Sequence, residues 1–510
     1  MSSVSRRHFL FGTLLAGAVP RAGFGSVPSL KALGYQSPNE KLNIAGIGAG
    51  GRASQVLGGC DTENIVALAD VDWARAADGF ARYSKATKYK DFRVMLDKEG
   101  KSIDAVTIAI PDHMHAVAAL ACMQLGKGVY VEKPLTRTPW EARVLTQAAR
   151  RHGVATQMGN QGYSHDATRV AAEIVWSGEI GDVTEVHAWH GRPGWPQGMT
   201  DIPAPEPVPE TLDWDLWLGG AAARPYTSGG AGYKDAHNTQ FGFYQPFNWR
   251  GFYDFGSGLI GDWAIHILGP ANWALRLGSP VSVECLKKDG KSPFTLPDNI
   301  VIKYEFAARK NMPPATVYWH DNVQGDAFTP PGMTVEQMRP IPNTGPVIPN
   351  PPASGRGGAG RAGGLPAGGA EPGRGAGRGG RGGQQAQGSG YNLIFVGSKG
   401  YLGTRARGEG VGLLPGSRWA EYTLPPPMLT RSPGHQRDWI RACKGGEPAC
   451  SNFGVAGPYT EWVLLGMVAT RVPGKLLWDA SKMEFTNNRE ANTYVRPVFR
   501  KGWEIRGVTT

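Results

Sequence analysis

The sequence has few cysteines and lacks a long uninterrupted apolar run. Its 5 cysteines among 510 residues are too few for a disulfide scaffold. Cys443 and Cys450 are close enough in sequence to form one bridge, whereas Cys122 falls in an expected buried helix. No apolar stretch reaches the roughly 20 residues that cross a bilayer. We therefore expect no stable membrane span once the N-terminal leader is removed.

That leader occupies residues 1–40 together with a linker. Arg6 and Arg7 precede a moderately apolar run, a pattern typical of twin-arginine export signals. The pattern predicts an encounter with the twin-arginine export machinery and a periplasmic or otherwise exported location. Because this route carries folded proteins, a cofactor would be loaded before export. Such a cofactor must be tightly held and recycled in place.

The excess of basic residues is concentrated in two places. The net charge is +11, of which residues 1–40 contribute +3 and residues 352–390 contribute +4. The second segment is a Gly/Arg-rich insert, and Arg-Gly-Gly repeats can bind RNA. It contains no aromatic residue, and the leader predicts export. We interpret the insert as a disordered surface loop between two sheet strands, and we expect no nucleic-acid partner.

A glycine-rich turn at residues 42–52 carries the clearest signal. An apolar run leads into Gly46, Gly48 and Gly51, followed by Arg52. In a dinucleotide-binding unit, one glycine makes the turn, the next lets the backbone approach a pyrophosphate, and the third lets helix pack on strand. The motif alone is weak among 72 glycines. Its position between a strand-like run and a helix gives it weight.

An acid at the end of the next apolar run bears on the choice of cofactor. Asp70 follows Gly51 by 19 residues, where an acid accepts hydrogen bonds from ribose hydroxyls and repels a 2′-phosphate. NAD is therefore favoured, and NADP is the alternative. Either Asp70 or Asp72 could instead only cap the following helix. Asp72 suits that role better.

Strands and helices then alternate, which predicts parallel βαβ units. We expect an N-terminal Rossmann domain over residues 41–161. Ligands of such sheets lie beyond the carboxyl ends of the strands. The turns expected to face a cofactor are 46–52, 70–73, 111–115 and 132–134. They present Pro111, His115, Glu132 and Lys133. Either His113 or His115 would cap its helix or pack on the nicotinamide ribose.

The second predicted domain, residues 162–510, begins with a helix and continues as an open, mostly antiparallel sheet. Its strands are expected at 183–191, 281–289, 299–308, 315–321 and 392–397. Between the first two strands lies a loop, 192–250, rich in aromatic residues. Sugars stack on rings while their hydroxyls meet polar groups. We expect the loop's own core to hold Trp214 and Trp217, and the substrate pocket to be lined by His190, Trp195, Tyr244 and Arg250.

Three motifs resemble the Gfo/Idh/MocA oxidoreductases, a family named for glucose-fructose oxidoreductase and inositol dehydrogenase. They are GIGAGGR at 46–52, EKP at 132–134 and GLIGDWAIHILG at 258–269. Four further segments resemble a secreted bacterial subgroup: 212–219, 246–251, 395–402 and 500–505. The resemblance covers about residues 41–505 apart from the insert. It implies a carbohydrate substrate and a homo-oligomer formed through the sheet face, and it places Lys133, Asp262 and His266 where nicotinamide meets substrate.

Alcohol oxidation requires such groups independently, because the protein must remove the hydroxyl proton. We assign His266 as the base, Lys133 as a hydroxyl-binding proton relay and Asp262 as an orienting partner, since a helix would place the last motif's Asp and His on one face. Asp262 could instead cap a helix, and His266 could be a core residue. The Asp–His pair could also be half of a metal site, but no third ligand is evident, so we expect no metal.

These observations favour an exported NAD(P)-dependent oxidoreductase that acts on a sugar, sugar acid or glycoside. A variant would oxidise a glycoside transiently to a keto-sugar, cleave the glycosidic bond and return the hydride without net redox. A second class of function is a non-catalytic sugar-binding protein on the same fold. Retention of Lys133, Asp262 and His266 argues against that class.

Overall fold

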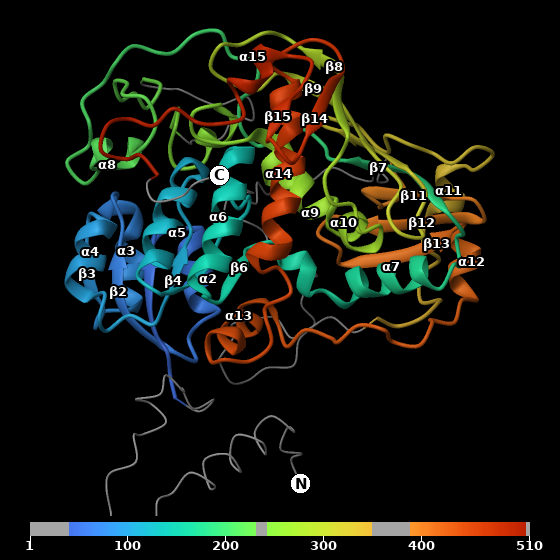
Figure 1. Ribbon diagram of the computed structural model, residues 1–510, viewed down its shortest axis with the longest axis horizontal. Coiled ribbons are helices and arrows are strands. Elements are labelled where there is room, and N and C mark those ends of the chain that lie inside the picture. The colour runs from blue at the N-terminus through green and yellow to red at the C-terminus, as the bar shows by residue number, and fades with distance from the viewer. Residues whose placement is uncertain (1–39, 231–241, 349–387, 506–510) are drawn as a thin grey trace, which may run out of the picture. The chain divides into compact units, whose positions relative to one another are not determined.

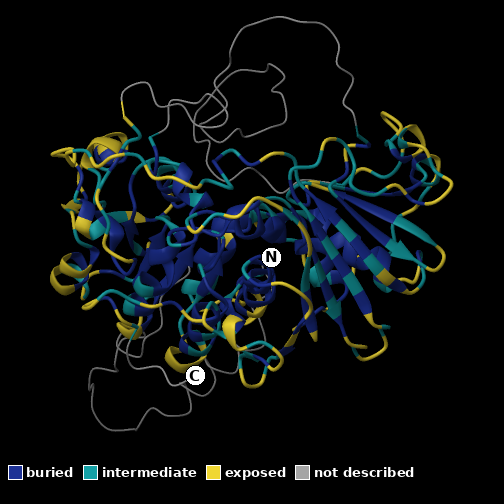
Figure 2. Cartoon of the chain, turned by 90° about the horizontal axis from the view of Figure 1, so that it is seen from above, coloured by how far each residue is buried: buried dark blue, intermediate teal, exposed yellow. Residues whose placement is uncertain are grey.

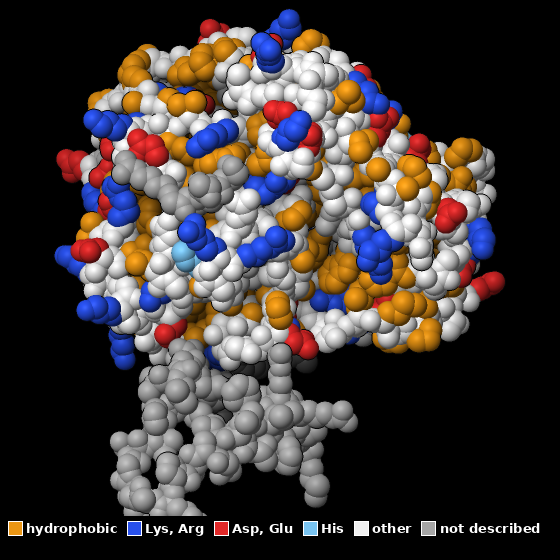
Figure 3. All heavy atoms as spheres, in the orientation of Figure 1, with side chains coloured by type: hydrophobic (Ala, Val, Ile, Leu, Met, Phe, Trp, Pro, Cys, Tyr) orange, Lys and Arg blue, Asp and Glu red, His pale blue; other side chains and the backbone are white. Residues whose placement is uncertain are grey.

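The computed structural model describes residues 40–230, 242–348 and 388–505. The predicted leader, except residue 40, and nearly all of the predicted insert therefore lie outside the described residues. Within the described ranges, no helix is both long and apolar enough to cross a membrane. On the face drawn in Figure 3, basic and acidic side chains are interspersed.

The N-terminal sheet has six parallel strands in the order β3-β2-β1-β4-β5-β6. The sequence predicted this Rossmann arrangement, and the structure confirms it. The strands are β1 (Asn43–Ile47), β2 (Asn64–Ala69), β3 (Thr87–Tyr89), β4 (Ala105–Ile108), β5 (Gly128–Val131) and β6 (Thr156–Met158). The helices between them are α2 (Arg52–Gly58), α3 (Trp73–Arg82), α4 (Phe92–Glu99), α5 (His115–Gln124) and α6 (Pro139–His152). In Figure 1 these elements run from blue to teal.

Local signals explain where these elements begin and end. Asp72 accepts a hydrogen bond from the backbone N–H of Arg75 and caps α3, so the expected role of Asp72 is confirmed. Thr138 and Glu141 form a capping box at the start of α6, which satisfies backbone donors reciprocally. Gly153 ends this helix at φ 62°, a conformation that favours glycine. Strands β4 and β5 are buried along their whole length, as expected for strands covered on both faces.

The second sheet has nine strands in the order β13-β12-β11-β7-β10-β9-β8-β14-β15. Only β7 and β10 pair in parallel, so the expected open, mostly antiparallel sheet is confirmed. The insert falls between β10 and β11 in the chain. The strands are β7 (Val183–Trp189), β8 (Ser282–Asp289), β9 (Asp298–Phe306), β10 (Ala315–His320), β11 (Leu393–Gly397), β12 (Gly400–Arg405), β13 (Gly410–Leu414), β14 (Leu476–Asp479) and β15 (Glu484–Phe485).

C-terminal helices join the two sheets, although the sequence alone suggested consecutive domains. Helix α14 (Phe453–Ala469) packs against both α6 and β8, and Figure 1 shows it standing between the two halves. Helix α13 (His435–Cys443) packs beside β6, and its Trp439 shares an apolar cluster with β1 and β5. Figure 2 shows the buried residues continuing along both sheets and these helices.

The remaining elements are short apart from α7, which covers one end of the second sheet. They are α7 (Asp166–Trp176), α8 (Trp214–Leu218), α9 (Ile265–Ile267), α10 (Gly269–Ala274), α11 (Val335–Met338), α12 (Gly416–Ala420), α15 (Arg489–Asn492), η1 (Asp112–Met114), η2 (Gln161–Ser164), η3 (Asn248–Gly251) and η4 (Ile260–Ala264).

All five cysteines are free thiols, so Cys443 and Cys450 form no bridge. Their side chains have different surroundings, which explains why sequence proximity does not bring them together. Cys443 packs against the apolar cluster under the Rossmann sheet, whereas the Sγ of Cys450 lies 3.4 Å from Ser164 Oγ. Cys122 is buried in α5, as expected.

Candidate dinucleotide and substrate site

The four turns predicted to face a cofactor line one cavity. It lies beyond the carboxyl ends of the parallel strands, where the topology brings these turns together. The lining residues that the turns contribute are Gly48, Gly50 and Arg52, then Asp70, Val71 and Asp72, then Ile110, Pro111 and Met114, and finally Glu132 and Lys133.

Close packing around the glycine turn requires glycine at two positions. Gly48 has φ +93°, and a Cβ there would lie 2.5 Å from the carbonyl oxygen of Ala109. A Cβ on Gly46 would lie 2.8 Å from Leu68 Cδ2. Gly46 therefore allows β1 and β2 to pack closely, and Gly48 lets the turn pack against the end of β4 while it lines the cavity. This geometry fits the pyrophosphate of a dinucleotide.

Asp70 lines the cavity and also shapes the glycine turn. Its carboxylate accepts hydrogen bonds from the backbone N–H groups of Ala49 at 2.8 Å and Asp72 at 3.0 Å. Burial raises the pKa of this carboxyl, although its backbone hydrogen bonds oppose the change. Arg75, which sequence reasoning missed, also lines the cavity. A Cβ on Gly51 would meet its guanidinium at 2.6 Å.

An ion pair joins the glycine turn to the turn after β5. The Nε and NH2 atoms of Arg52 donate to Glu132 Oε1 at 3.1 and 2.9 Å. Burial opposes the charge of Glu132, but the Arg52 guanidinium outweighs it and lowers the pKa of the carboxyl. The first and last turns of the predicted cofactor site are thereby fixed to each other.

The motif lysine and aspartate, 129 positions apart in the chain, form a buried ion pair. Lys133 Nζ lies 2.6 Å from Asp262 Oδ1, and the two side chains are 7% and 8% exposed. Arg250 Nε contacts the same oxygen at 3.2 Å. Burial disfavours the charged carboxylate, but Lys133 and Arg250 prevail and lower the pKa of Asp262. Both cations line the cavity, so one carboxylate positions two cationic side chains.

The expected pairing of Asp262 with His266 is not formed. Residues Ile260–Ala264 form a π-helix whose N-cap is Leu259, so Asp262 lies within the helix and does not cap it. His266 lies beyond this turn, in α9 (Ile265–Ile267). Among the described residues, the side-chain bonds of Asp262 lead to Lys133 and Arg250.

His266 is buried nearby, with a ring nitrogen available. It is 2% exposed, and its Nδ1 has no hydrogen-bond partner among the described residues. Burial, followed by the positive charges of Lys133 and Arg407, lowers the pKa of this imidazole well below its usual value. The surroundings therefore favour the neutral imidazole and oppose its protonation.

Arg407, Trp263 and Asp112 lie near this centre and were not foreseen, whereas His190 was among the expected pocket residues. The Arg407 guanidinium carbon lies 4.8 Å from the centre of the Trp263 ring, and the His190 ring stacks on Trp263 at 4.2 Å. Asp112 is buried and accepts a hydrogen bond from Ser257 Oγ at 3.1 Å. Burial raises the pKa of Asp112 to about 8, against the effect of Arg250. Arg407 lies far from the motifs in the sequence, so the sequence does not indicate its place here. The position of Asp112 directly after Pro111 does not indicate that its side chain is buried.

Several predicted site residues are not among those that line the cavity: of the four expected to line the substrate pocket, only Arg250 does so. Tyr244 lies in an apolar cluster with Trp214 and Trp217, which confirms that these tryptophans fill the loop's core. Trp195 is buried and donates to Gln197 at 3.2 Å. The ring nitrogens of His115 lie 2.8 Å from the carbonyl oxygens of Pro134 and Ile110. His113 contacts the carbonyl oxygen of Trp217 at 3.0 Å.

The arrangement combines the Rossmann turns with cationic groups at one end of the cavity. Lys133 and Arg250 can donate hydrogen bonds to a hydroxyl, whereas His266 is buried and is not among the residues that line the cavity. Among the described residues, no group of three or more His, Cys, Asp or Glu side chains is placed to hold a metal ion.

Comparisons with known proteins agree with this arrangement. A model described as an oxidoreductase family with an NAD-binding Rossmann fold matches residues 41–160. Another, described as the C-terminal alpha/beta domain of an oxidoreductase family, matches residues 180–305. The solved WlbA dehydrogenase from Bordetella pertussis, in complex with NADH and UDP-GlcNAcA, shares the fold. Its TM-score is 0.53 at 13% identity, over 86% of this chain and 99% of that one.

Sequence relatives match in part. Inositol 2-dehydrogenase 2 of Saccharopolyspora erythraea is 32% identical over 139 residues, or 27% of this chain and 40% of that protein. Levoglucosan dehydrogenase of Pseudarthrobacter phenanthrenivorans is 27% identical over 134 residues, or 25% of this chain and 34% of that protein. The matched segments thus span less than half of either relative.

Proposed function

This chain belongs to the Gfo/Idh/MocA oxidoreductase family, and we propose that it oxidises or reduces a CH–OH group of a sugar, sugar acid or glycoside with NAD as cofactor. The observation that carries the proposal is the buried Lys133–Asp262 pair on the wall of the cavity. A lysine fixed by a carboxylate beside a dinucleotide cradle is suited to holding a reacting hydroxyl.

The Rossmann turns would hold the dinucleotide. Gly48 and Gly50 line the cavity where its pyrophosphate would lie, and Asp70 lines it where a ribose hydroxyl would be bound. A carboxylate at this position disfavours a 2′-phosphate, which is why we propose NAD over NADP. The chemistry that the bound cofactor supplies is acceptance and return of hydride, which side chains cannot provide.

The proton would be handled by Lys133 and His266. Lys133 Nζ donates a hydrogen bond to the substrate oxygen, while Asp262 keeps the amino group in place. Lys133 would relay the hydroxyl proton to His266, which does not itself line the cavity, while the carbinol carbon loses hydride, so that a neutral ketone would be formed. In this scheme Asp262 orients Lys133, where the sequence spacing had suggested His266. A positioned base contributes about 10²–10⁴ in rate.

A panel of hexoses, polyols, uronic acids and glycosides tests the proposal. Each compound is incubated with the protein and NAD, and products are analysed by mass spectrometry while NADH fluorescence is followed. We expect a keto-sugar to form with wild type, and at least about 10²-fold more slowly with Lys133→Ala. Glycoside cleavage without NADH accumulation would identify the internal redox cycle. Nucleotide binding without any conversion would favour a sugar-binding protein.

We further propose that Arg6 and Arg7 direct twin-arginine export to the periplasm, and that chains associate through the open face of the second sheet. The leader pattern supports the first statement. The alternation of buried and half-buried residues along β9 and β10 supports the second. Cell fractionation of the full chain and light scattering of the purified protein test them separately.

A further inference from the structure

Two segments from outside the Rossmann domain close the far end of the cofactor cavity. One is the segment around α8, and the other is residues 499–505, here called the strap. Leu216, Trp217 and Trp503 from these segments line the cavity together with the glycine turn. We propose that the strap encloses the adenosine half of the dinucleotide and makes its release slow. This inference rests on the proposed function only in taking NAD as the ligand.

The α8 segment is attached to the turn that carries Asp70. Trp73 N–H donates to Thr211 O at 3.0 Å, and Asp213 N–H donates to Val71 O at 2.9 Å. Asp72 and Leu212 form an isolated antiparallel bridge between these hydrogen bonds. The segment therefore lies over the ribose end of the cavity as an extension of the turn after β2.

Arg500 attaches the strap to α8. Its Nε donates to Gly219 O at 2.9 Å, and its NH2 donates to Asp215 O at 2.8 Å. Its backbone N–H also donates to Gly220 O at 3.0 Å, and its guanidinium pairs with the Asp215 carboxylate. Figure 1 shows the red C-terminal segment passing α8 above the upper ends of the blue strands. One arginine thus fixes the strap at several points.

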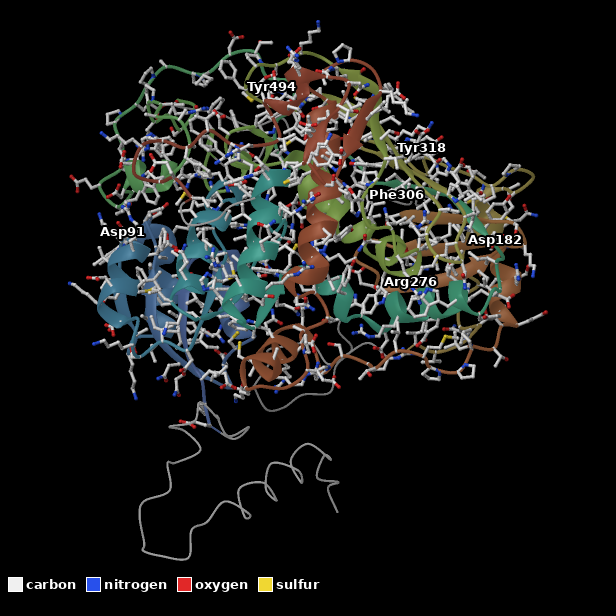
Figure 4. All side chains as sticks on the ribbon, viewed as in Figure 1. Asp91, Asp182, Arg276, Phe306, Tyr318 and Tyr494 are labelled. Carbon is white, nitrogen blue, oxygen red and sulfur yellow. The ribbon has the colours of Figure 1, made fainter. Side chains whose placement is uncertain are left out.

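Trp503 is the strap's contact with the edge of the Rossmann sheet. It is 6% exposed, and its ring lies 6.4 Å from that of Phe92. The Arg93 guanidinium carbon lies 3.9 Å from the centre of the indole. Trp503 lines the cavity beside Lys90, Asp91 and Phe92, which follow β3. Figure 4 labels Asp91 at this edge.

The sheet order identifies which part of the cofactor lies there. The ribose-binding position, Asp70, ends β2, and Lys133 follows β5 on the opposite side of β1. Trp503 and Phe92 lie beyond β2, on the β3 side and away from Lys133. The nicotinamide reacts at the Lys133 end, so the group reaching the β3 side is adenine. A flat purine matches an aromatic niche, because bases stack on aromatic rings irrespective of sequence.

Release of the dinucleotide would then require the strap to detach from α8 and α4 together. We expect the cofactor to stay bound over many catalytic cycles. Such retention suits an enzyme whose cofactor is oxidised and reduced in place.

The test measures the rate at which NADH leaves the protein. NADH-loaded protein is mixed with excess NAD, and the loss of NADH fluorescence is followed. Trp503→Ala and Arg500→Ala should each accelerate release by roughly 5- to 150-fold, the scale of one lost base–aromatic stack. Trp503→Phe should give an intermediate rate. Val498→Ala is the matched control, because this residue directly precedes the strap and is 90% exposed.

Unchanged release in Trp503→Phe and Arg500→Ala, with thermal midpoints like that of wild type, would overturn the proposal. Acceleration by Val498→Ala equal to that by Arg500→Ala would overturn it too, because it would indicate general loosening. If the wild-type chain binds no NADH, the proposed function itself fails. If it binds NADH and the variants release it at the same rate as wild type, only the strap fails. No substrate is needed, so the readout is independent of turnover.

Discussion

Replacing Asp262 by Asn tests whether this carboxylate acts through Lys133. The Asn oxygen can still accept hydrogen bonds, but it lacks the negative charge of the Asp262 carboxylate, to which Lys133 and Arg250 both donate. A hydrogen bond to a charged group contributes about 1.5–3 kcal/mol. We therefore expect kcat/KM to fall by roughly 10- to 150-fold, and Lys133→Met to lower it by at least about 10² and by no less than Asp262→Asn does.

The double variant Lys133→Met with Asp262→Asn separates a role of Asp262 that depends on Lys133 from one that does not. Once Lys133 is gone, the second substitution should change kcat/KM by less than about threefold, since residues that act as a unit are non-additive. The assay is the initial rate of cofactor reduction with the most active sugar of the panel. Breaking a buried pair costs about 3–5 kcal/mol, so rates are compared where thermal unfolding shows every variant folded.

A full additional loss in the double variant would refute this account of Asp262. The same cycle with His266→Gln is the control. Asp262 makes no hydrogen bond to His266 among the described residues, so the effects of these two substitutions should multiply. Coupling of Asp262 to His266, and not to Lys133, would restore the role that the sequence spacing suggested.

Three further perturbations test separate features of the site and the chain. Because folding raises the pKa of Asp112 to about 8, the folded state keeps a proton that the unfolded chain loses at about pH 3.9. The free energy of unfolding of wild type should therefore fall as pH rises through this window, and that of Asp112→Asn should exceed it by up to about 1.4 kcal/mol more per pH unit until about pH 8. A difference in urea midpoints that does not depend on pH would show that the acid is already ionised. His266→Ala should lower turnover by about 10² or more while NADH still binds. If turnover is retained and the free energy of unfolding falls strongly, His266 is a core residue and Lys133 remains as the base. Deleting residues 352–387 should leave solubility and cofactor binding intact, and insoluble protein from this deletion would show that the insert is structural. Extending the deletion to residue 390 removes Ser389, whose N–H donates to Asp326 at 2.8 Å, and should therefore lower the thermal midpoint.

The sequence predicted the parts of the site that depend on local pattern. A glycine turn after a strand, an acid after the next strand and a lysine after β5 converge at one sheet edge, because parallel strands present their carboxyl ends together. Gly48, Asp70 and Lys133 could therefore be placed in one cavity without coordinates.

Contacts between distant segments could not be predicted in this way. The spacing of Asp262 and His266 suggested a partner within the motif, whereas the side-chain hydrogen bonds of Asp262 lead to Lys133 and Arg250. Nothing in the sequence around Trp503 indicates that it lines the cavity with the Rossmann turns, and nothing around Arg407 indicates that it reaches Trp263. The burial of Asp112 is likewise a property of the surrounding fold.

The central claim, a site built for NAD, is tested most directly by identifying the nucleotide that the purified full-length protein carries. The protein is denatured, and the released nucleotide is identified and quantified by mass spectrometry against the amount of protein. The account predicts NAD or NADH at near-stoichiometric amounts, because Asp70 lies at the ribose position and the strap encloses the adenosine half. Release of NADP, or of no nucleotide from a well-folded preparation, would contradict it.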